Sequence, residues 1–139
     1  MQTITQKLLD GLKNAEDIKT FLDLHEHEFL SQTLTDYLNE LMTDKNITVA
    51  GISRNSGIGE YVYKIFSGER RATRDVLISV AFGMELSIEE TQLLLRIAKF
   101  AVLDSREKRD SVIIYAFTHK MTVFECDDLL NENNLITLI

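Results

Sequence analysis

The feature that most limits how this chain can fold is an internal duplication in its second half. Residues 74–103 and 109–138 align without a gap at an offset of 35 residues, and nine of the 30 aligned positions are identical. For sequences of this composition, chance would give about two identities over this length. The identical residues stand at positions 74, 75, 78, 81, 82, 90, 94, 95 and 103 of the first copy. A period of this length that holds two helical patterns indicates a helical hairpin present twice.

Each copy has the pattern of two helices joined by a short turn. The first helix begins at an Arg-Asp pair, whose carboxylate lies near the positive N-terminal end of the helix dipole. The second helix begins at a capping box, in which Ser or Thr is followed three residues later by Glu, at residues 87–90 and 122–125. Lys120 lies in the turn of the second copy, where we expect a left-handed residue or a longer turn. Because two repeats are too few for a free-standing solenoid, we expect the hairpins to stack on the helices before them.

Three consecutive helices are predicted between residues 34 and 68. Residues 33–36 have the pattern of a capping box, and they open a helix whose inner face carries five apolar residues: Leu34, Tyr37, Leu38, Leu41 and Met42. Thr48 caps a second, short helix around Ile52, which the sequence Ser-Gly-Ile-Gly at residues 56–59 ends. Val62 and Ile65 form the buried side of a third helix. Two short helices joined by a tight turn and packed on another helix form a helix-turn-helix arrangement.

The predicted fold class is all-α: a helical bundle with a helix-turn-helix core followed by a duplicated helical hairpin. Residues 1–33 form an N-terminal helical extension, in which Asn14 caps a second helix and Asp17 lies in its first turn. Residues 34–103 form the helix-turn-helix domain. Residues 104–139 form a C-terminal hairpin packed on it as a single compact unit. The sequence contains no proline, which favours a bundle of short helices over a strand-and-turn protein.

Composition argues against several classes of protein. No run of about 18 apolar residues occurs, so we expect no membrane-spanning segment and no membrane partner. The N-terminus lacks the features of a signal peptide, and the single cysteine, Cys126, rules out an intrachain disulfide, so we expect a cytoplasmic protein. The sequence shows neither a nucleophile paired with a base nor a grouping of metal ligands. We therefore expect no enzyme, cofactor or metal site, and we expect Cys126 to be a packed thiol.

The charged residues are distributed unevenly along the chain. The net charge is −7, which by itself argues against a nucleic-acid partner. Residues 45–74, however, hold six basic and two acidic residues, a local charge of +4, so the remainder of the chain carries −11. A basic segment in an acidic protein is typical of one binding face whose surroundings oppose non-specific association. The basic residues of this segment are Lys45, Arg54, Lys64, Arg70, Arg71 and Arg74.

From Leu34 to Leu95 the chain resembles the Xre/Cro/C1-type helix-turn-helix family, the phage-repressor-like transcription regulators. The resemblance rests on the helix at residues 34–42, on Thr48 and Ile52, on the turn at residues 57–59, on residues 62–65 and on Gly68. Over residues 15–138 the chain also resembles a set of small regulators from Firmicutes-type bacteria. The resemblance implies a repressor-like core, a homodimer, and double-stranded DNA bound through its major groove.

Nine residues are candidates for DNA binding. Base readout is assigned to Glu60, Tyr61, Tyr63 and Lys64, and phosphate contacts are assigned to Arg54, Ser67, Arg70, Arg71 and Arg74. Two alternatives stay open. The tyrosines can instead pack against neighbouring helices. Arg74 can instead serve the hairpin, because its repeat partner Arg109 lies outside the basic segment.

Two functions from different classes follow from these observations. The first is a sequence-specific DNA-binding transcriptional regulator that acts as a dimer. The second is a protein-interaction module, antitoxin-like or a signalling adaptor, on a helix-turn-helix scaffold with weakened DNA readout. Departures from the family pattern favour the second function: Val49 replaces the usual glutamine, and the spacing of 11 from Gly57 to Gly68 is one residue short. Glu60 would also repel phosphate unless it accepts from a cytosine amino group.

Overall fold

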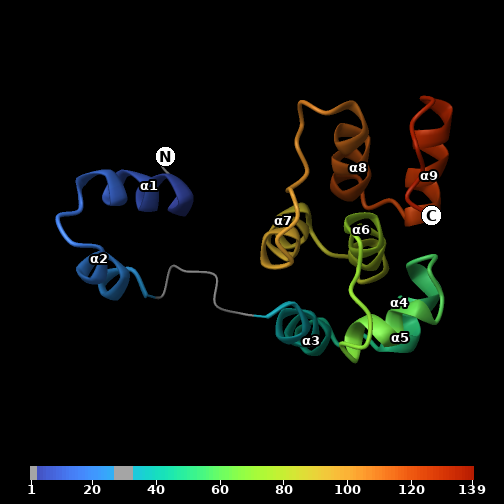
Figure 1. The fold of residues 1–139 in the computed structure, drawn as a ribbon. Helices are drawn as coiled ribbons and strands as arrows, with labels where there is room; N and C mark the ends of the chain where they lie inside the picture. Colours follow the sequence, from blue (N-terminus) through green and yellow to red (C-terminus); the bar gives the residue numbers. More distant parts are fainter. Residues whose placement is uncertain (1–2, 27–32) are drawn as a thin grey trace. The chain divides into compact units, whose positions relative to one another are not determined.

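The structure, a computed structural model, describes residues 3–26 and 33–139 (Figure 1). Within these ranges all regular secondary structure is helical and includes nine α-helices, and this confirms the predicted all-α class. The chain forms two compact units, residues 1–31 and residues 32–139. The segments predicted as residues 34–103 and 104–139 lie together in the second unit.

The first unit contains α1 (Ile4–Asn14) and α2 (Ile18–Leu24), which contact each other and bury Phe21. The predicted cap at Asn14 is wrong: Asn14 is the last residue of α1, and its side-chain amide donates to the carbonyl of Asp10 at 2.9 Å. Asp17 caps α2 instead, because its carboxylate accepts from the backbone N–H of Thr20 at 3.1 Å. A hydrogen bond from the Thr20 hydroxyl is the main cause that lowers the pKa of Asp17, and the bond from the Thr20 backbone N–H adds to it.

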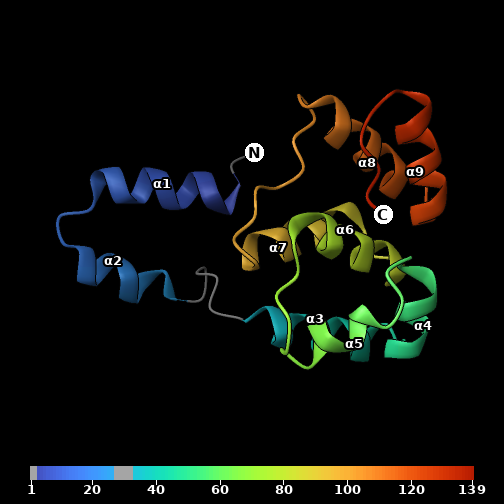
Figure 2. The ribbon, with the colours of Figure 1, turned by 45° about the vertical axis from the view of Figure 1, so that its right-hand side comes forward.

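The second unit is organised around α6, whose residues 77–83 are all buried. α4 contacts both α5 and α6, and α3 contacts α5 and α7. The second hairpin joins this core through contacts of α8 with α7 and of α9 with α6. Figure 2 shows α3, α4 and α5 on one side of α6 and the second hairpin on the other. The helices are α3 (Leu34–Asp44), α4 (Val49–Asn55), α5 (Tyr61–Phe66), α6 (Arg74–Gly83), α7 (Ile88–Ile97), α8 (Lys108–Thr118) and α9 (Val123–Glu132).

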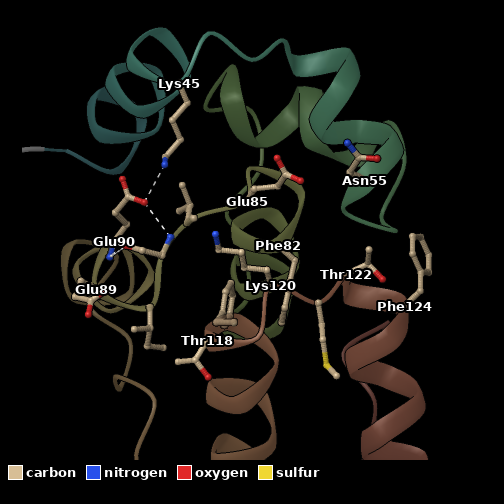
Figure 3. Close-up of a pocket in the computed structure, with 15 residues that line it drawn as sticks. Lys45, Asn55, Phe82, Glu85, Glu89, Glu90, Thr118, Lys120, Thr122 and Phe124 are labelled. Atoms are coloured by element: carbon tan, nitrogen blue, oxygen red, sulfur yellow. Dashed lines mark hydrogen bonds and ion pairs between the residues drawn. The ribbon is translucent and has the colours of Figure 1, made fainter.

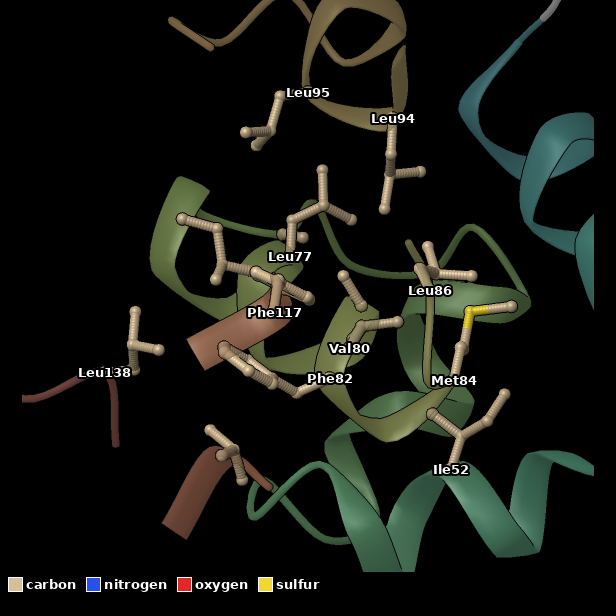
Figure 4. Close-up of a cluster of buried hydrophobic side chains, with 14 of the residues drawn as sticks. Ile52, Leu77, Val80, Phe82, Met84, Leu86, Leu94, Leu95, Phe117 and Leu138 are labelled. Carbon is tan, nitrogen blue, oxygen red and sulfur yellow. The ribbon is translucent and has the colours of Figure 1, made fainter. Parts of the chain in front are cut away.

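One hydrophobic core joins these helices. Side chains from α4, α6, α7, α8 and the C-terminal segment converge on it, and Ile52, Leu77 and Leu94 are fully buried (Figure 4). On α3, Tyr37, Leu38 and Leu41 are buried, while Leu34 and Met42 are half-buried against the core, so the predicted inner face of this helix is confirmed. Burial is also the main cause that raises the pKa of the Tyr37 hydroxyl.

Polar side chains set where most of these helices begin. At Thr48 the hydroxyl accepts from the backbone N–H of Gly51 at 3.1 Å, as predicted. Both predicted capping boxes of the duplicated hairpins are confirmed, because Glu90 and Glu125 accept back from the backbone N–H of Ser87 and Thr122 at 2.9 and 3.0 Å. At residues 33–36 only one of the two hydrogen bonds of a capping box forms, in which the Thr33 hydroxyl accepts from the backbone N–H of Asp36. The return bond is missing because the side chain at this position is an aspartate, which is one methylene shorter than a glutamate.

Five helices of the second unit end in the same way, without glycine. The second residue after the helix end is left-handed, with φ between 53° and 64°, and the N–H of the residue that follows it bonds back to a carbonyl in the last turn. This is the Schellman arrangement. The prediction of a left-handed residue at Lys120, where φ is 55°, is confirmed. The left-handed residues are Asn46, Glu85, Lys99, Lys120 and Asn134.

The duplication is repeated in the hydrogen bonds of the two hairpins. After the first hairpin the chain runs back along α7, where the Gln92 side chain exchanges two hydrogen bonds of 2.8 Å with the backbone of Leu103. After the second hairpin, Asp127 accepts from the backbone N–H of Leu138 at 2.7 Å. Gln92 and Asp127 are 35 residues apart, as are Leu103 and Leu138. The sequence period is therefore a structural period as well.

Candidate nucleic-acid interface

The candidate interface is centred on α5, a helix of six residues. Its inner side consists of Val62, Ile65 and Phe66, which are buried where α5 contacts α3 and α4. The turn before it contains Gly57 and Gly59 with φ of 78° and 62°, a left-handed backbone that favours glycine. Residues 56–60 therefore reverse the chain tightly and set α5 against α4.

The outer side of α5 carries most of the residues predicted to contact bases. Tyr63 is 47% exposed, and Glu60 and Lys64 are exposed too. Tyr61 differs, because it is half-buried and its hydroxyl donates to the backbone carbonyl of Arg71 at 3.3 Å. Tyr61 thus connects α5 to the segment that follows it. This is close to the alternative in which a tyrosine packs inside the protein, whereas Tyr63 projects into solvent.

The four central cations of the basic segment are exposed: Arg54, Lys64, Arg70 and Arg71. They form no ion pair with any part of the chain that the structure describes. The cations at the two ends are paired: Lys45 Nζ lies 3.0 Å from Glu90 Oε1, and Arg74 Nη2 lies 3.0 Å from Asp110 Oδ2. Four unpaired cations and the two acids Glu60 and Glu69 remain, so the local charge of +4 falls to +2 at this surface.

Arg74 has its guanidinium committed inside the protein. Nε donates to the carbonyl of Ala101 at 2.9 Å, Nη2 donates to the carbonyl of Val102 at 3.2 Å, and both terminal nitrogens donate to Asp110. The helix that begins here is capped by Thr73, not by the Arg-Asp pair. Arg74 therefore joins the two hairpins, and it does not belong to the exposed cations around α5.

Ser67 is the remaining candidate for a phosphate contact. It is exposed, and its hydroxyl donates to the backbone carbonyl of Lys64 at 3.1 Å. The same oxygen lies 3.4 Å from the backbone N–H of Glu69. The side chain thus closes the end of α5, and because its one hydrogen is donated to Lys64, the hydroxyl can donate to another group only by breaking that bond.

The described residues show little sign of other chemistry. Cys126 is fully buried, and burial, assisted by the charge of Asp127, raises the pKa of its thiol to about 12. No three His, Cys, Asp or Glu side chains in residues 3–26 and 33–139 are grouped as metal ligands. None of the helices that the structure describes has the length and apolar character needed to cross a bilayer.

Comparisons with protein-family models, with curated proteins and with solved structures find no match to this chain.

Proposed function

We propose that this protein is a sequence-specific DNA-binding transcriptional regulator, that it acts as a dimer, and that α5 enters the major groove. The observation that carries the proposal is the contrast between the two sides of α5. Its inner side is fixed by buried apolar residues, while Tyr63 and Lys64 project outward among cations that form no ion pair with residues 3–26 or 33–139. A short helix held rigidly against a neighbour is the device that places side chains against base edges.

The exposed residues divide into two roles under this proposal. Tyr63, Lys64 and Glu60 are the side chains that reach bases, with Glu60 accepting from a cytosine amino group. Arg54, Arg70 and Arg71 neutralise phosphates, and Ser67 donates to one after its hydroxyl releases the carbonyl of Lys64. A dimer would present two copies of α5 about 34 Å apart, one turn of DNA, and so would read a palindromic site. The proposal also implies a cytoplasmic location.

The test is a salt-titrated binding assay on genomic DNA fragments. Specific fragments should be preferred over random DNA, and the logarithm of the binding constant should fall with the logarithm of salt concentration with a slope of about −3 per protomer for the three phosphates that the arginines neutralise. The variant Lys64→Glu/Arg70→Glu should lose binding. Lys99→Glu/Lys108→Glu is the matched control, because it makes the same change of charge at exposed lysines away from α5. Failure of every fragment to bind better than random DNA at low salt would overturn the proposal.

The second candidate is a protein-interaction module, antitoxin-like or a signalling adaptor. One observation favours it: Glu60, the residue before α5, is exposed and makes no cap hydrogen bond, so a carboxylate stands at the end of the helix that would approach DNA. The same variant separates the two functions. A defined protein partner that binds Lys64→Glu/Arg70→Glu as tightly as the wild type, in the absence of any DNA binding, would select the interaction module.

A further inference from the structure

A groove of about 720 Å³ lies on the side of the second unit where the two hairpin turns meet the ends of α3 and α4. Its floor is aromatic: the rings of Phe82 and Phe117 are stacked, with centroids 3.9 Å apart and planes inclined by 13°. Leu86 and Met121 extend this floor, and Phe124, which is half exposed, stands at one side. The volume is in the range that binds drug-sized ligands or a few residues of a peptide.

Uncommitted polar side chains surround this apolar floor. Asn55, Glu85, Glu89 and Lys120 are exposed, and their side chains make no hydrogen bond or ion pair with any described residue. The adjacent Lys45 and Glu90 form an ion pair with each other, with Nζ 3.0 Å from Oε1. Figure 3 shows Glu85 and Lys120 in the middle of the groove, between that ion pair on one side and Phe124 on the other. The groove therefore offers an apolar surface together with both hydrogen-bond donors and acceptors.

Glu85 and Lys120 occupy the same place in the two copies of the hairpin. They are 35 residues apart, and their φ angles are 54° and 55°. Glycine would adopt this left-handed conformation more easily, so each long side chain costs about 1 kcal/mol at its position. The duplication thus brings two oppositely charged side chains to one groove from two equivalent turns.

We propose that this groove binds an extended segment of another protein in which a Lys or Arg side chain stands next to an apolar one. The apolar side chain would lie on Phe117 and Met121, and the cation would pair with Glu85. The amide of Asn55 and the ammonium of Lys120 would form hydrogen bonds with the backbone of the segment, whose peptide groups need both donors and acceptors. Stacked helical hairpins commonly form concave surfaces of this kind. This inference does not depend on DNA binding by α5.

The test uses two pools of fluorescein-labelled hexapeptides, with Arg fixed at the third position of one pool and Glu at the third position of the other. The fourth position is a mixture of Leu, Ile, Met and Phe in both pools, and the other positions are Gly, Ser or Ala. Fluorescence anisotropy with the full chain should show the Arg pool binding about ten-fold or more tightly than the Glu pool. Methyl shifts of Met121 and Ile88 on binding would place the peptides in the groove.

Variants keep the test independent of folding. Glu85→Gly removes the carboxylate at a position where glycine is easier for the backbone, so it should weaken the Arg pool several-fold without loss of stability. Lys99→Gly is the matched control, because Lys99 is also left-handed but lies outside the groove, and it should leave binding unchanged. Three results would overturn the inference: no binding of the Arg pool, equal binding of the two pools, or full binding by Glu85→Gly/Glu89→Gln. Displacement of the peptides by benzyltrimethylammonium at equal affinity would overturn it as well, because the groove would then take small lipophilic cations.

Discussion

Arg74 of the first hairpin pairs with Asp110 of the second, with Nη2 3.0 Å from Oδ2, and Asp110 is the repeat equivalent of Asp75. The converse pair is present too: Arg109 Nη1 lies 2.9 Å from Asp75 Oδ1. Each arginine therefore uses the aspartate of the other copy. Each also binds the segment that follows its own hairpin, Arg74 at Ala101 and Arg109 at the equivalent carbonyl of Ile136. Two exchanged ion pairs thus fasten the copies to each other.

The two pairs should contribute unequally to stability. Asp110 is buried and accepts a further hydrogen bond from the backbone N–H of Asp104 at 3.0 Å, whereas the side chain of Asp75 is 39% exposed. Asp110→Asn should therefore lower the free energy of unfolding by about 2–3 kcal/mol, because it leaves the Arg74 guanidinium without a counter-charge in a largely buried site. Asp75→Asn should cost about 1 kcal/mol. Urea unfolding of both variants measures the difference, and equal costs would contradict this account.

The sequence was sufficient to predict the all-α class, the period of 35 residues and the helix starts at Thr48, Ser87 and Thr122. These features depend on residues within one helical turn of each other or on direct repetition, which a single sequence displays. The role of Arg74 depended on a partner 36 residues away, and an Arg-Asp dipeptide does not show which aspartate its arginine will use. The charge counted along residues 45–74 therefore overestimates the positive charge of the surface around α5.

The groove was missed for a related reason. No motif in the sequence singles out Glu85, Glu89 or Asn55. They line one groove because two turns 35 residues apart meet the ends of α3 and α4 in space. The period alone could have placed Glu85 opposite Lys120, but the aromatic floor requires the packing of α6 against α8.

Gly83 of α6 lies close against α4 and its C-cap residue Ser56. A Cβ atom there would lie 2.9 Å from Ser56 Cβ and 3.0 Å from the backbone at both Ile52 O and Ser56 N. Since backbone atoms of α4 cannot move aside alone, Gly83→Ala should destabilise the fold by about 1–3 kcal/mol. Gly51→Ala within α4 is the control, because its nearest contact would be 3.3 Å and alanine favours a helix. Thermal unfolding should separate the two variants, and a Gly83→Ala protein as stable as Gly51→Ala would refute the close contact.

Lys99 offers a way to stabilise the protein. It follows α7 with φ of 64°, and its side chain makes no hydrogen bond or ion pair in the described part of the chain. Lys99→Gly should raise the free energy of unfolding by about 0.5–1 kcal/mol, because glycine adopts the left-handed region without the steric cost. Asn131→Gly, on the exposed side of α9, should lower it by a similar amount. A loss of stability in the Lys99→Gly protein, measured by urea unfolding, would argue against the left-handed turn.

Glu90 should make stability depend on pH. Although burial raises its pKa, hydrogen bonds from the Ser87 backbone and from Lys45 outweigh that effect and lower the pKa of the folded protein below the ordinary 4.5. A lowered folded pKa stabilises the native state above pH 4.5, and this contribution is lost as the pH falls through the folded value. Glu90→Gln should cost about 1 kcal/mol at pH 7 and lose less stability than the wild type between pH 7 and pH 3. Glu89→Gln, at the exposed neighbouring position, should follow the wild-type profile; identical profiles for all three proteins would contradict the assignment.

Cys126 should be unreactive in the native protein. Its pKa of about 12 means that about one thiol in ten thousand is ionised at pH 8, and complete burial also blocks access of a reagent. Modification by Ellman's reagent should therefore proceed only as fast as local or global unfolding exposes α9, and it should be immediate in 6 M guanidinium chloride. The control is a surface thiol, Ser105→Cys, in the background Cys126→Thr. Threonine stands at the equivalent position 91, where its hydroxyl donates to the carbonyl of Ser87 at 2.8 Å. If native Cys126 reacted as fast as the thiol at position 105, the buried position of α9 against α6 would be refuted.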